Sequence, residues 1–201
     1  AFMLRSQDLH QVEFPDTLKA IARAGAGVNN IPLQRCSDEG IVVFNAPGAN
    51  ANAVKELVLA GMLLGSRAIY PGMKYVDSLG PQEGLDALLE KEKKRFAGTE
   101  LTGKTLGVVG LGNIGSLVAN MGLALGMRVI GHDPAISVEA AWRLSSDVEK
   151  MDNLAALFAR ADYISLHLPV LDATRGLIGA GLLGSAKRGA VLLNFARGEI
   201  V

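Results

Sequence analysis

Short apolar runs recur along the second half of the chain, and stretches with helical spacing separate them. The runs cover residues 106–110, 127–133, 163–169 and 190–196. None of them alternates strictly between apolar and polar positions, which is typical of strands covered on both faces of a sheet. Over 113–125 the apolar residues fall on one helical stripe, and Gly126 follows at the position of a C-cap glycine. Strands alternating with helices predict an α/β fold with a doubly wound parallel sheet.

The first part of the chain is organised differently. Residues 2–6 and 40–48 are expected to form strands, and residues 16–31 a helix or a strand that ends in a glycine-rich loop. Pro47 and Gly48 indicate a boundary, after which residues 50–69 have the composition of a long helix. We therefore expect two domains, 1–48 and 49–201, of which the second holds the parallel sheet.

A glycine motif follows the first apolar run of the second domain. Gly110, Gly112 and Gly115 match G-x-G-x-x-G, and the motif closes a predicted strand and opens an amphipathic helix. This is the context that a Rossmann dinucleotide fingerprint requires. The glycines permit a tight turn, close approach of a pyrophosphate and close packing of the helix, whose N-terminus attracts the phosphates. A glycine-rich turn without a ligand is the simpler alternative.

The next apolar run ends in Asp133, directly before Pro134. A carboxylate at this position accepts hydrogen bonds from the adenosine ribose and repels a 2′-phosphate. No Arg or Lys follows directly, so the sequence favours NAD over NADP. A turn-forming aspartate before a proline would look the same.

A second phosphate-binding pattern is present but stands in the wrong context. Residues 98–105, "GTELTGKT", satisfy the Walker A pattern. A P-loop needs a strand before it and a helix after it, whereas here a charged stretch precedes the pattern and a strand follows it. We therefore do not expect an NTPase, and the charged run 90–96 is interpreted as a solvated helix face.

One arginine and one histidine follow strands on the ligand-binding edge. Arg197 comes after the last apolar run, where its guanidinium could grip a carboxylate through two parallel hydrogen bonds. A surface arginine would occupy the same position, so position alone leaves both interpretations open. His167 could act as a base, but a packed or hydrogen-bonding role is more common for a lone histidine at a strand end.

Composition narrows the class of partner. Lys plus Arg and Asp plus Glu each number 20, so the net charge of +0 argues against nucleic acid or an anionic membrane as the main partner. The single Cys36 cannot form an internal disulfide, which fits a cytoplasmic location. The longest apolar helical segment, 57–65, is too short to span a bilayer, and no Cys/His cluster has the spacing of a metal site.

Taken together, several segments resemble the D-isomer-specific 2-hydroxyacid dehydrogenases. They are "RAGAGVNNI", "GIVVFNAPGANANAVKELVLAGML", "FAGTELTGKTLGVVGLGNIGS", "VIGHDP", "YISLHLPVLDATRGLI" and "LLNFARGEIV". The resemblance implies a Rossmann domain and part of a smaller, flavodoxin-like substrate domain. It also implies NAD-dependent oxidation of D-3-phosphoglycerate to 3-phosphohydroxypyruvate, the first step of serine biosynthesis. Glyoxylate or hydroxypyruvate reduction is the alternative within the family, and a non-catalytic, corepressor-like module that senses NAD is the alternative outside it.

The resemblance assigns roles to individual residues. It makes Arg197 the catalytic arginine, which holds the substrate carboxylate and polarises the C2 oxygen. The expected cofactor contacts are Ala26, Gly110, Gly112, Asn113, Ile114, Gly115, Asp133, Leu168, Pro169, Phe195, Ala196 and Arg197. The expected substrate contacts are Arg5, Ser6, Gly27 and Asn50, although helix capping would also explain Asn50. In the family, smaller residues are frequent at the position of Phe195, so a larger side chain stands at this expected cofactor contact. No metal site is expected.

The resemblance also bears on completeness and assembly. In the family a histidine paired with a glutamate acts as the base, and both would lie beyond Val201, while further substrate-domain residues would precede Ala1. We therefore expect the chain to look truncated at both ends and to be inactive by itself. Related enzymes associate through the nucleotide domain, so a homodimer or homotetramer is expected, with 54–69 and the segment up to Gly103 at the interface.

Overall fold

The computed structural model describes residues 1–201, and its contacts divide the chain into two compact units, Ala1–Asn52 and Ala53–Val201. The division falls at the start of a long helix, shortly after the Pro47–Gly48 pair at which the sequence suggests a boundary. No helix is long and apolar enough to cross a lipid bilayer.

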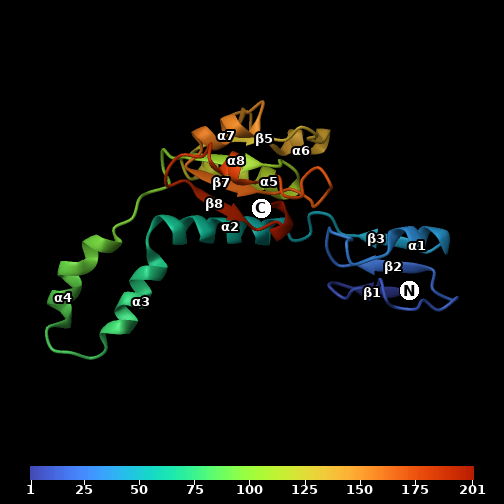
Figure 1. The fold of residues 1–201 in the computed structure, drawn as a ribbon, viewed down its shortest axis with the longest axis horizontal. Helices are drawn as coiled ribbons and strands as arrows, with labels where there is room; N and C mark the ends of the chain where they lie inside the picture. Colours follow the sequence, from blue (N-terminus) through green and yellow to red (C-terminus); the bar gives the residue numbers. More distant parts are fainter. The chain divides into compact units, whose positions relative to one another are not determined.

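The first unit is a three-stranded parallel sheet with one short helix (Figure 1). Its elements are β1 (Phe2–Leu4), β2 (Ala20–Arg23), β3 (Val42–Asn45) and α1 (Leu33–Asp38), with the strands in the order β1-β2-β3. Its core consists of Leu9, Leu18, Ile21, Ile31, Cys36 and Ile41. Within 16–31 the structure has a strand and no helix, because β2 is the central strand and pairs with a neighbour on each side.

The second unit is built on a five-stranded parallel sheet in the order β6-β5-β4-β7-β8. The strands are β4 (Thr105–Val109), β5 (Arg128–His132), β6 (Glu149–Lys150), β7 (Tyr163–Leu166) and β8 (Val191–Asn194). The sheet helices are α2 (Ala51–Ser66), α5 (Asn113–Ala124), α6 (Val138–Arg143), α7 (Leu154–Arg160) and α8 (Ala180–Leu183), and the short 3-10 helix η2 (Gly198–Ile200) ends the chain. The strand order reverses at β4, whose neighbours β5 and β7 both follow it in sequence, so a topological switch point lies at its carboxyl end.

Both faces of this sheet are covered, as the continuous apolar runs predict. On one face, α2 and α5 contribute buried residues that pack with Leu106 and Val108 of β4. On the other face, α7 packs closely enough that a Cβ on Gly107 would lie 2.6 Å from a methyl group of Leu157. β4 itself is buried along its whole length, which fixes the strand that carries the glycine motif.

The long helix expected over 50–69 is present, but it ends three residues earlier than expected. The helix α2 ends at Ser66, Ala68 adopts a left-handed φ of 49°, and α3 (Ile69–Leu79) begins at the next residue. Pro71 explains the break, because in a continuous helix its ring would clash with the carbonyl of Arg67, whereas the first turn of a new helix tolerates it. The Ser66 carbonyl instead accepts a hydrogen bond from the Thr99 amide at 2.7 Å.

The helices α3 and α4 (Leu85–Glu92) and the short 3-10 helix η1 (Lys93–Phe96) form an arm that extends from the sheet of the second unit (Figure 1). None of their residues is buried. The arm is held together by apolar contacts, among them the Tyr75 and Phe96 rings, whose centroids lie 5.3 Å apart. Its charged side chains form surface pairs such as Arg95 with Glu92, as expected of a solvated face.

The end of α5 and the start of β4 show how local sequence sets the limits of these elements. α5 ends in a Schellman motif, in which the amides of Gly126 and Met127 donate to the carbonyls of Leu123 and Gly122. Gly126 has a φ of +73°, which glycine adopts without strain. At the Walker-like stretch, β4 begins at Thr105, so Lys104 precedes a strand and does not face a helix N-terminus.

Candidate dinucleotide site

The glycine loop begins where β4 reaches the switch point. Gly110 has a φ of +87°, and its amide donates to the His132 carbonyl at 2.9 Å. A Cβ on Gly110 would lie 2.5 Å from the His167 carbonyl oxygen, so both the backbone conformation and the neighbouring strand demand a glycine. The turn is therefore locked between the ends of β5 and β7.

The other two glycines shape the surface above α5. A Cβ on Gly115 would lie 1.8 Å from the Gly110 carbonyl oxygen, so helix and loop could not approach this closely with any other residue. Gly112 is the N-cap of α5, and a Cβ at this position would meet no atom within 4 Å. The first amides of a helix lack intrahelical acceptors and carry partial positive charge. An open, amide-lined cradle of this kind fits the pyrophosphate of a dinucleotide.

Asp133 is tied to the glycine loop by its own carboxylate. One oxygen accepts from the Leu111 amide at 2.8 Å, and the other accepts from the Ala135 amide at 2.9 Å. These bonds orient the carboxylate at the end of β5, beside the loop that would hold the phosphates. Remaining lone pairs can accept from ribose hydroxyls, because an ionised carboxylate offers about four acceptor sites.

His167, Leu168 and Pro169 follow β7 and border the same edge. The Nε2 atom of His167 lies 2.8 Å from Oγ of the fully buried Ser165. Burial lowers the pKa of His167 to about 4, so its imidazole is neutral at pH 7. A neutral histidine that is hydrogen-bonded within the fold has a structural explanation, and its low pKa makes it a weak proton acceptor.

The segment after β8 presents Arg197 on a braced loop. The Asn194 side chain accepts from the Ala196 amide at 3.1 Å and donates to the Arg197 carbonyl at 2.8 Å. The Arg197 guanidinium is exposed and donates to the Ala196 carbonyl at 2.8 Å. The loop backbone is thus fixed by Asn194, while the guanidinium holds only a local contact that a carboxylate could replace.

Phe195 packs within the fold as well as bordering this loop. A Cβ on Gly61 of α2 would lie 3.1 Å from the Phe195 ring, so the ring occupies the space that the glycine leaves. The side chain remains 37% exposed. Packing against Gly61 therefore explains why a large ring is present at position 195. The expected contact of Phe195 with the cofactor remains a prediction.

The expected substrate residues of the first unit lie at the carboxyl ends of its strands. Arg5 and Ser6 follow β1 and are exposed, and the segment containing Ala26 and Gly27 follows β2. Asn45, the last residue of β3, donates from its side chain to the Ala26 carbonyl at 2.8 Å. Asn50 is exposed directly before α2.

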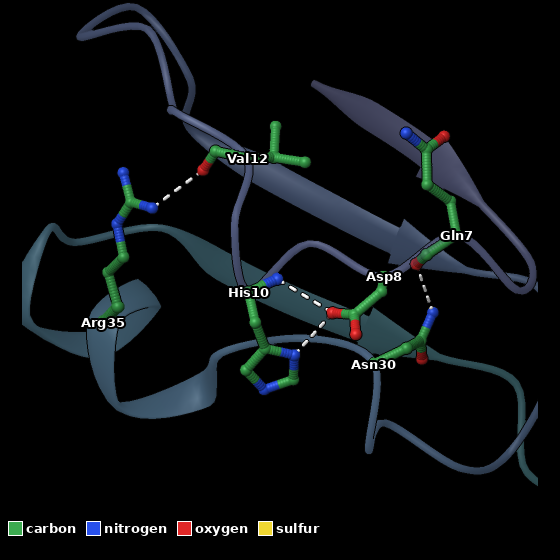
Figure 2. A network of polar contacts seen from close by, with 6 residues as sticks. All are labelled: Gln7, Asp8, His10, Val12, Asn30 and Arg35. Carbon is green, nitrogen blue, oxygen red and sulfur yellow. Dashed lines mark hydrogen bonds and ion pairs between the residues drawn. The ribbon is translucent and has the colours of Figure 1, made fainter.

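A network of polar contacts anchors the connection between β1 and β2 (Figure 2). The Asn30 side chain donates to the Gln7 carbonyl at 2.7 Å, and Arg35 donates to the Val12 carbonyl at 2.8 Å. Between them, Asp8 accepts from both the amide and the ring of His10, and these hydrogen bonds hold the pKa of the Asp8 carboxyl below its usual value. The network fixes the chain directly after Arg5 and Ser6.

Two arginines near these edges were missed by sequence reasoning. Arg23 ends β2, and its Nε is buried without a hydrogen-bond partner, while its guanidinium lies against Gly25. Arg143 ends α6 and donates to the Asn113 side chain at 2.8 Å. Arg23 could have been found from the sequence, because it is a charged residue at the end of an otherwise apolar strand. The contact of Arg143 with Asn113 arises from tertiary packing and has no sequence pattern.

Within the second unit, the fold brings the expected cofactor residues to one edge of the sheet. The glycine loop, Asp133, the segment 167–169 and the segment 195–197 all follow the carboxyl ends of parallel strands. No group of three or more His, Cys, Asp or Glu residues could hold a metal ion. The arrangement suits binding of an anionic dinucleotide and of a small carboxylate beside it.

Comparisons with known proteins agree with this geometry. Residues 60–201 match the sequence model for "D-isomer specific 2-hydroxyacid dehydrogenase, NAD binding domain". The chain is 41% identical over 191 residues to a D-3-phosphoglycerate dehydrogenase of Methanocaldococcus jannaschii, covering 94% of this chain and 34% of that protein. It is also 41% identical over 190 residues to a hydroxypyruvate reductase of Thermotoga maritima, covering 94% of this chain and 57% of that protein.

A solved structure is similar over nearly the whole chain. It is the D-lactate dehydrogenase from Aquifex aeolicus complexed with NAD and lactic acid, with a TM-score of 0.74 and 30% identity. The match covers 92% of this chain and 51% of that one. The chain therefore spans between about a third and somewhat more than half of the proteins it resembles.

Proposed function

This chain belongs to the D-isomer specific 2-hydroxyacid dehydrogenase family, and on that premise we propose that the protein oxidises D-3-phosphoglycerate to 3-phosphohydroxypyruvate with NAD. The observation that carries the proposal is the open amide cradle at Gly112, held beside Asp133 at the switch point of the sheet. When bound there, NAD would accept the hydride from C2 of the substrate.

The chain's own residues would bind and orient the reactants. The amides at the start of α5 hold the pyrophosphate, and Asp133 accepts hydrogen bonds from the adenosine ribose. Arg197 grips the substrate carboxylate in a bidentate contact and draws negative charge toward the C2 oxygen. His167 is not assigned as the proton acceptor, because its Nε2 is hydrogen-bonded to Ser165 and its pKa of about 4 makes it a weak base. The proton of the C2 hydroxyl would pass to the histidine–glutamate base that the family resemblance implies.

The choice of a phosphorylated substrate rests on cations in the first unit. Arg5 follows β1, and Arg23 ends the neighbouring strand, with Leu4 and Arg23 paired in the register of the two strands. Two guanidinium groups at one edge suit the phosphate end of a three-carbon acid. The similarity to a hydroxypyruvate reductase keeps hydroxypyruvate and glyoxylate as alternative substrates.

A panel of 2-hydroxy acids tests the proposal. We expect NADH formation by the full-length protein with the highest kcat/KM on D-3-phosphoglycerate, compared with D-lactate and D-glycerate. Arg5→Gln should raise the KM for D-3-phosphoglycerate and leave that for D-glycerate unchanged, because only the former carries the phosphate. NADH binding without turnover of any acid would instead support a non-catalytic, NAD-sensing module.

We also propose that two copies of this chain associate through the α2 surface and the arm. Large apolar side chains are exposed there, namely Leu57, Leu63, Leu64, Ile69, Tyr70, Met73 and Val76. Val76 also lines a cavity of about 400 Å³ between the arm helices, together with Gly72, Tyr75, Leu89, Glu90, Lys93 and Phe96. An apolar surface of this extent is characteristic of an interface, and a second copy with the same surface would cover it.

A cytoplasmic location is part of the same proposal. Cys36 is the only cysteine and is buried, and burial raises the pKa of its thiol. A buried, protonated thiol is unreactive, so nothing in the fold depends on an oxidising compartment.

A further inference from the structure

Arg143 reaches from the end of α6 to the start of α5. Its Nη1 donates to Oδ1 of Asn113, the first residue of α5, at 2.8 Å. Asn113 directly follows Gly112, above which the cradle is open. We propose that Arg143 is a further cofactor-binding residue, whose guanidinium contacts the pyrophosphate of the dinucleotide. The assignment rests on the proposed binding of NAD.

An anion bound between Arg143 and the N-terminus of α5 would be attracted by both positive charges. The N-terminus of a helix carries about half a positive charge, so a guanidinium beside it is repelled unless an anion lies between them. α5 has 12 residues, so its dipole is well developed. Hydrogen bonds from its own amide and from Ser137 lower the pKa of the Glu139 carboxyl, one turn earlier in α6, and the charge of Arg143 adds to this effect. Arg143 and Glu139 attract each other but form no direct ion pair. The pyrophosphate of a dinucleotide would bring a second and closer negative charge to the Arg143 guanidinium.

The backbone of Arg143 is fixed independently of its side chain. The Asn120 side chain of α5 donates to the Arg143 carbonyl at 2.8 Å and accepts from the Ser145 amide at 3.0 Å. These two bonds clamp the end of α6 to α5, so replacing the exposed Arg143 side chain should leave the backbone in place. A guanidinium on a fixed backbone is pre-organised to grip phosphate oxygens in pairs.

The position of the contact selects the pyrophosphate among the anionic groups of a dinucleotide. Arg143 bonds to the first residue of α5, where the helix amides would receive the pyrophosphate. A 2′-phosphate would lie on the adenosine ribose, beside the Asp133 carboxylate, which repels it. Arg143 therefore strengthens binding of NAD without favouring NADP.

Titration of the protein with NADH, followed by NADH fluorescence, tests the assignment. We expect Arg143→Gln to weaken NADH binding about tenfold, the effect of losing one charge-assisted contact. The decrease in affinity with added salt should also become shallower, because one phosphate–cation pair is lost. Arg143→Lys should keep the salt dependence of the unmodified protein and bind NADH more tightly than Arg143→Gln. Lysine retains the positive charge but lacks the two parallel N–H donors of a guanidinium.

Arg128→Gln is the matched control. It makes the same charge change at the exposed amino end of β5, opposite the cofactor edge, and should leave NADH affinity unchanged. Competition with ADP and with adenosine locates the contact: Arg143→Gln should weaken ADP about tenfold and leave adenosine unaffected.

The outcomes separate two kinds of failure. If the unmodified protein binds no NADH, the proposed function is wrong. If it binds NADH, but Arg143→Gln binds NADH and ADP equally well with the same salt dependence, the assignment of Arg143 is overturned. A loss confined to NADPH, which would place the guanidinium at the 2′-phosphate, overturns it too.

Discussion

The edge of the sheet that carries the expected cofactor residues and the arm of α3, α4 and η1 belong to the same unit. They differ in whether their side chains and amides find partners within the chain. At the edge, the Gly110 amide, the Leu111 amide and the Asp133 carboxylate all find partners within the chain. In the arm, no residue of α3, α4 or η1 is buried, and Met73 is 60% exposed. The polar groups of the edge are satisfied within one chain, whereas the arm leaves apolar side chains exposed, which the proposed second copy would cover.

This difference predicts opposite responses to substitution. A change at the edge should disturb the folding or ligand binding of a single chain, because its partners lie in that chain. A change in the arm should alter association and spare the fold, because its apolar side chains have few contacts to lose within one copy.

The largest effect is expected from Met73→Glu in the arm. A charge in an apolar interface typically costs about 2 kcal/mol, and a two-fold interface contains the substitution twice, so the dimer should dissociate about a thousandfold more readily. Sedimentation velocity at a series of protein concentrations measures this change. The melting temperature of the monomer should not change, because Met73 is exposed within one chain.

Met3→Glu serves as the control, because Met3 is 85% exposed and lies in β1, outside the arm. It makes the same substitution and should leave association unchanged. A clean monomer for the unmodified protein at high concentration would contradict the proposed interface.

The next effect concerns two glycines of the same loop. Gly115→Val should lower the free energy of unfolding by more than about 3 kcal/mol, because the new Cβ meets the Gly110 carbonyl at 1.8 Å and the backbone cannot move away easily. Gly112→Ala should change the stability by less than about 0.5 kcal/mol, since φ is −69° and the space is open.

Urea unfolding and NADH titration of both variants separate folding from binding. Gly112→Ala should fold normally and still bind NADH more weakly, because its methyl group points to the place where the phosphates approach. Unchanged NADH affinity in a folded Gly112→Ala protein would argue against a cradle at this position.

The two regions also differ in how well sequence predicts them. The strands β4, β5, β7 and β8 are visible because they are continuously apolar, and the glycine motif identifies the loop between β4 and α5. β6 was missed because it consists of Glu149 and Lys150, both exposed, so no hydrophobic pattern marks it. The end of α2 was misplaced because its apolar pattern continues past Ser66, while the effect of Pro71 acts through a carbonyl one turn earlier.

Contacts between distant residues explain what sequence leaves out of the site. The ring of Phe195 fills space left by Gly61, and Arg143 bonds to Asn113 although 30 positions separate them. Spacing rules describe neighbours along a helix or strand, and they carry no information about such tertiary pairs. The motif residues were found because the backbone conformation that they require is local.

A pH-dependent effect is expected from His167. Its pKa of about 4 in the folded protein lies below the value of about 6.5 expected after unfolding, so the unfolded state takes up the proton first as pH falls. Stability should therefore decrease between about pH 6.5 and pH 4, by up to about 3 kcal/mol from this residue.

Urea unfolding across this pH range should show a flatter profile for His167→Gln than for the unmodified protein. His10→Gln, at an exposed histidine of the first unit, is the control and should leave the profile of the second unit unchanged. An equally steep profile for His167→Gln would mean that other groups cause the acid sensitivity.

The smallest effect is expected from Asp133→Asn, which tests whether the completed edge also selects the cofactor. Asparagine keeps one oxygen that can accept from the Leu111 amide, so the bond to the glycine loop should persist, but the bond from the Ala135 amide and the negative charge are lost. NADH affinity should fall about tenfold as a charge-assisted bond to the ribose weakens, and NADPH affinity should rise as repulsion of the 2′-phosphate disappears. Parallel titrations with NADH and NADPH give the ratio of the two dissociation constants, and Asp86→Asn in α4 controls for the change in net charge. If the ratio stayed the same in Asp133→Asn, the carboxylate would serve only to brace the glycine loop, and the selectivity would have to come from elsewhere along the edge.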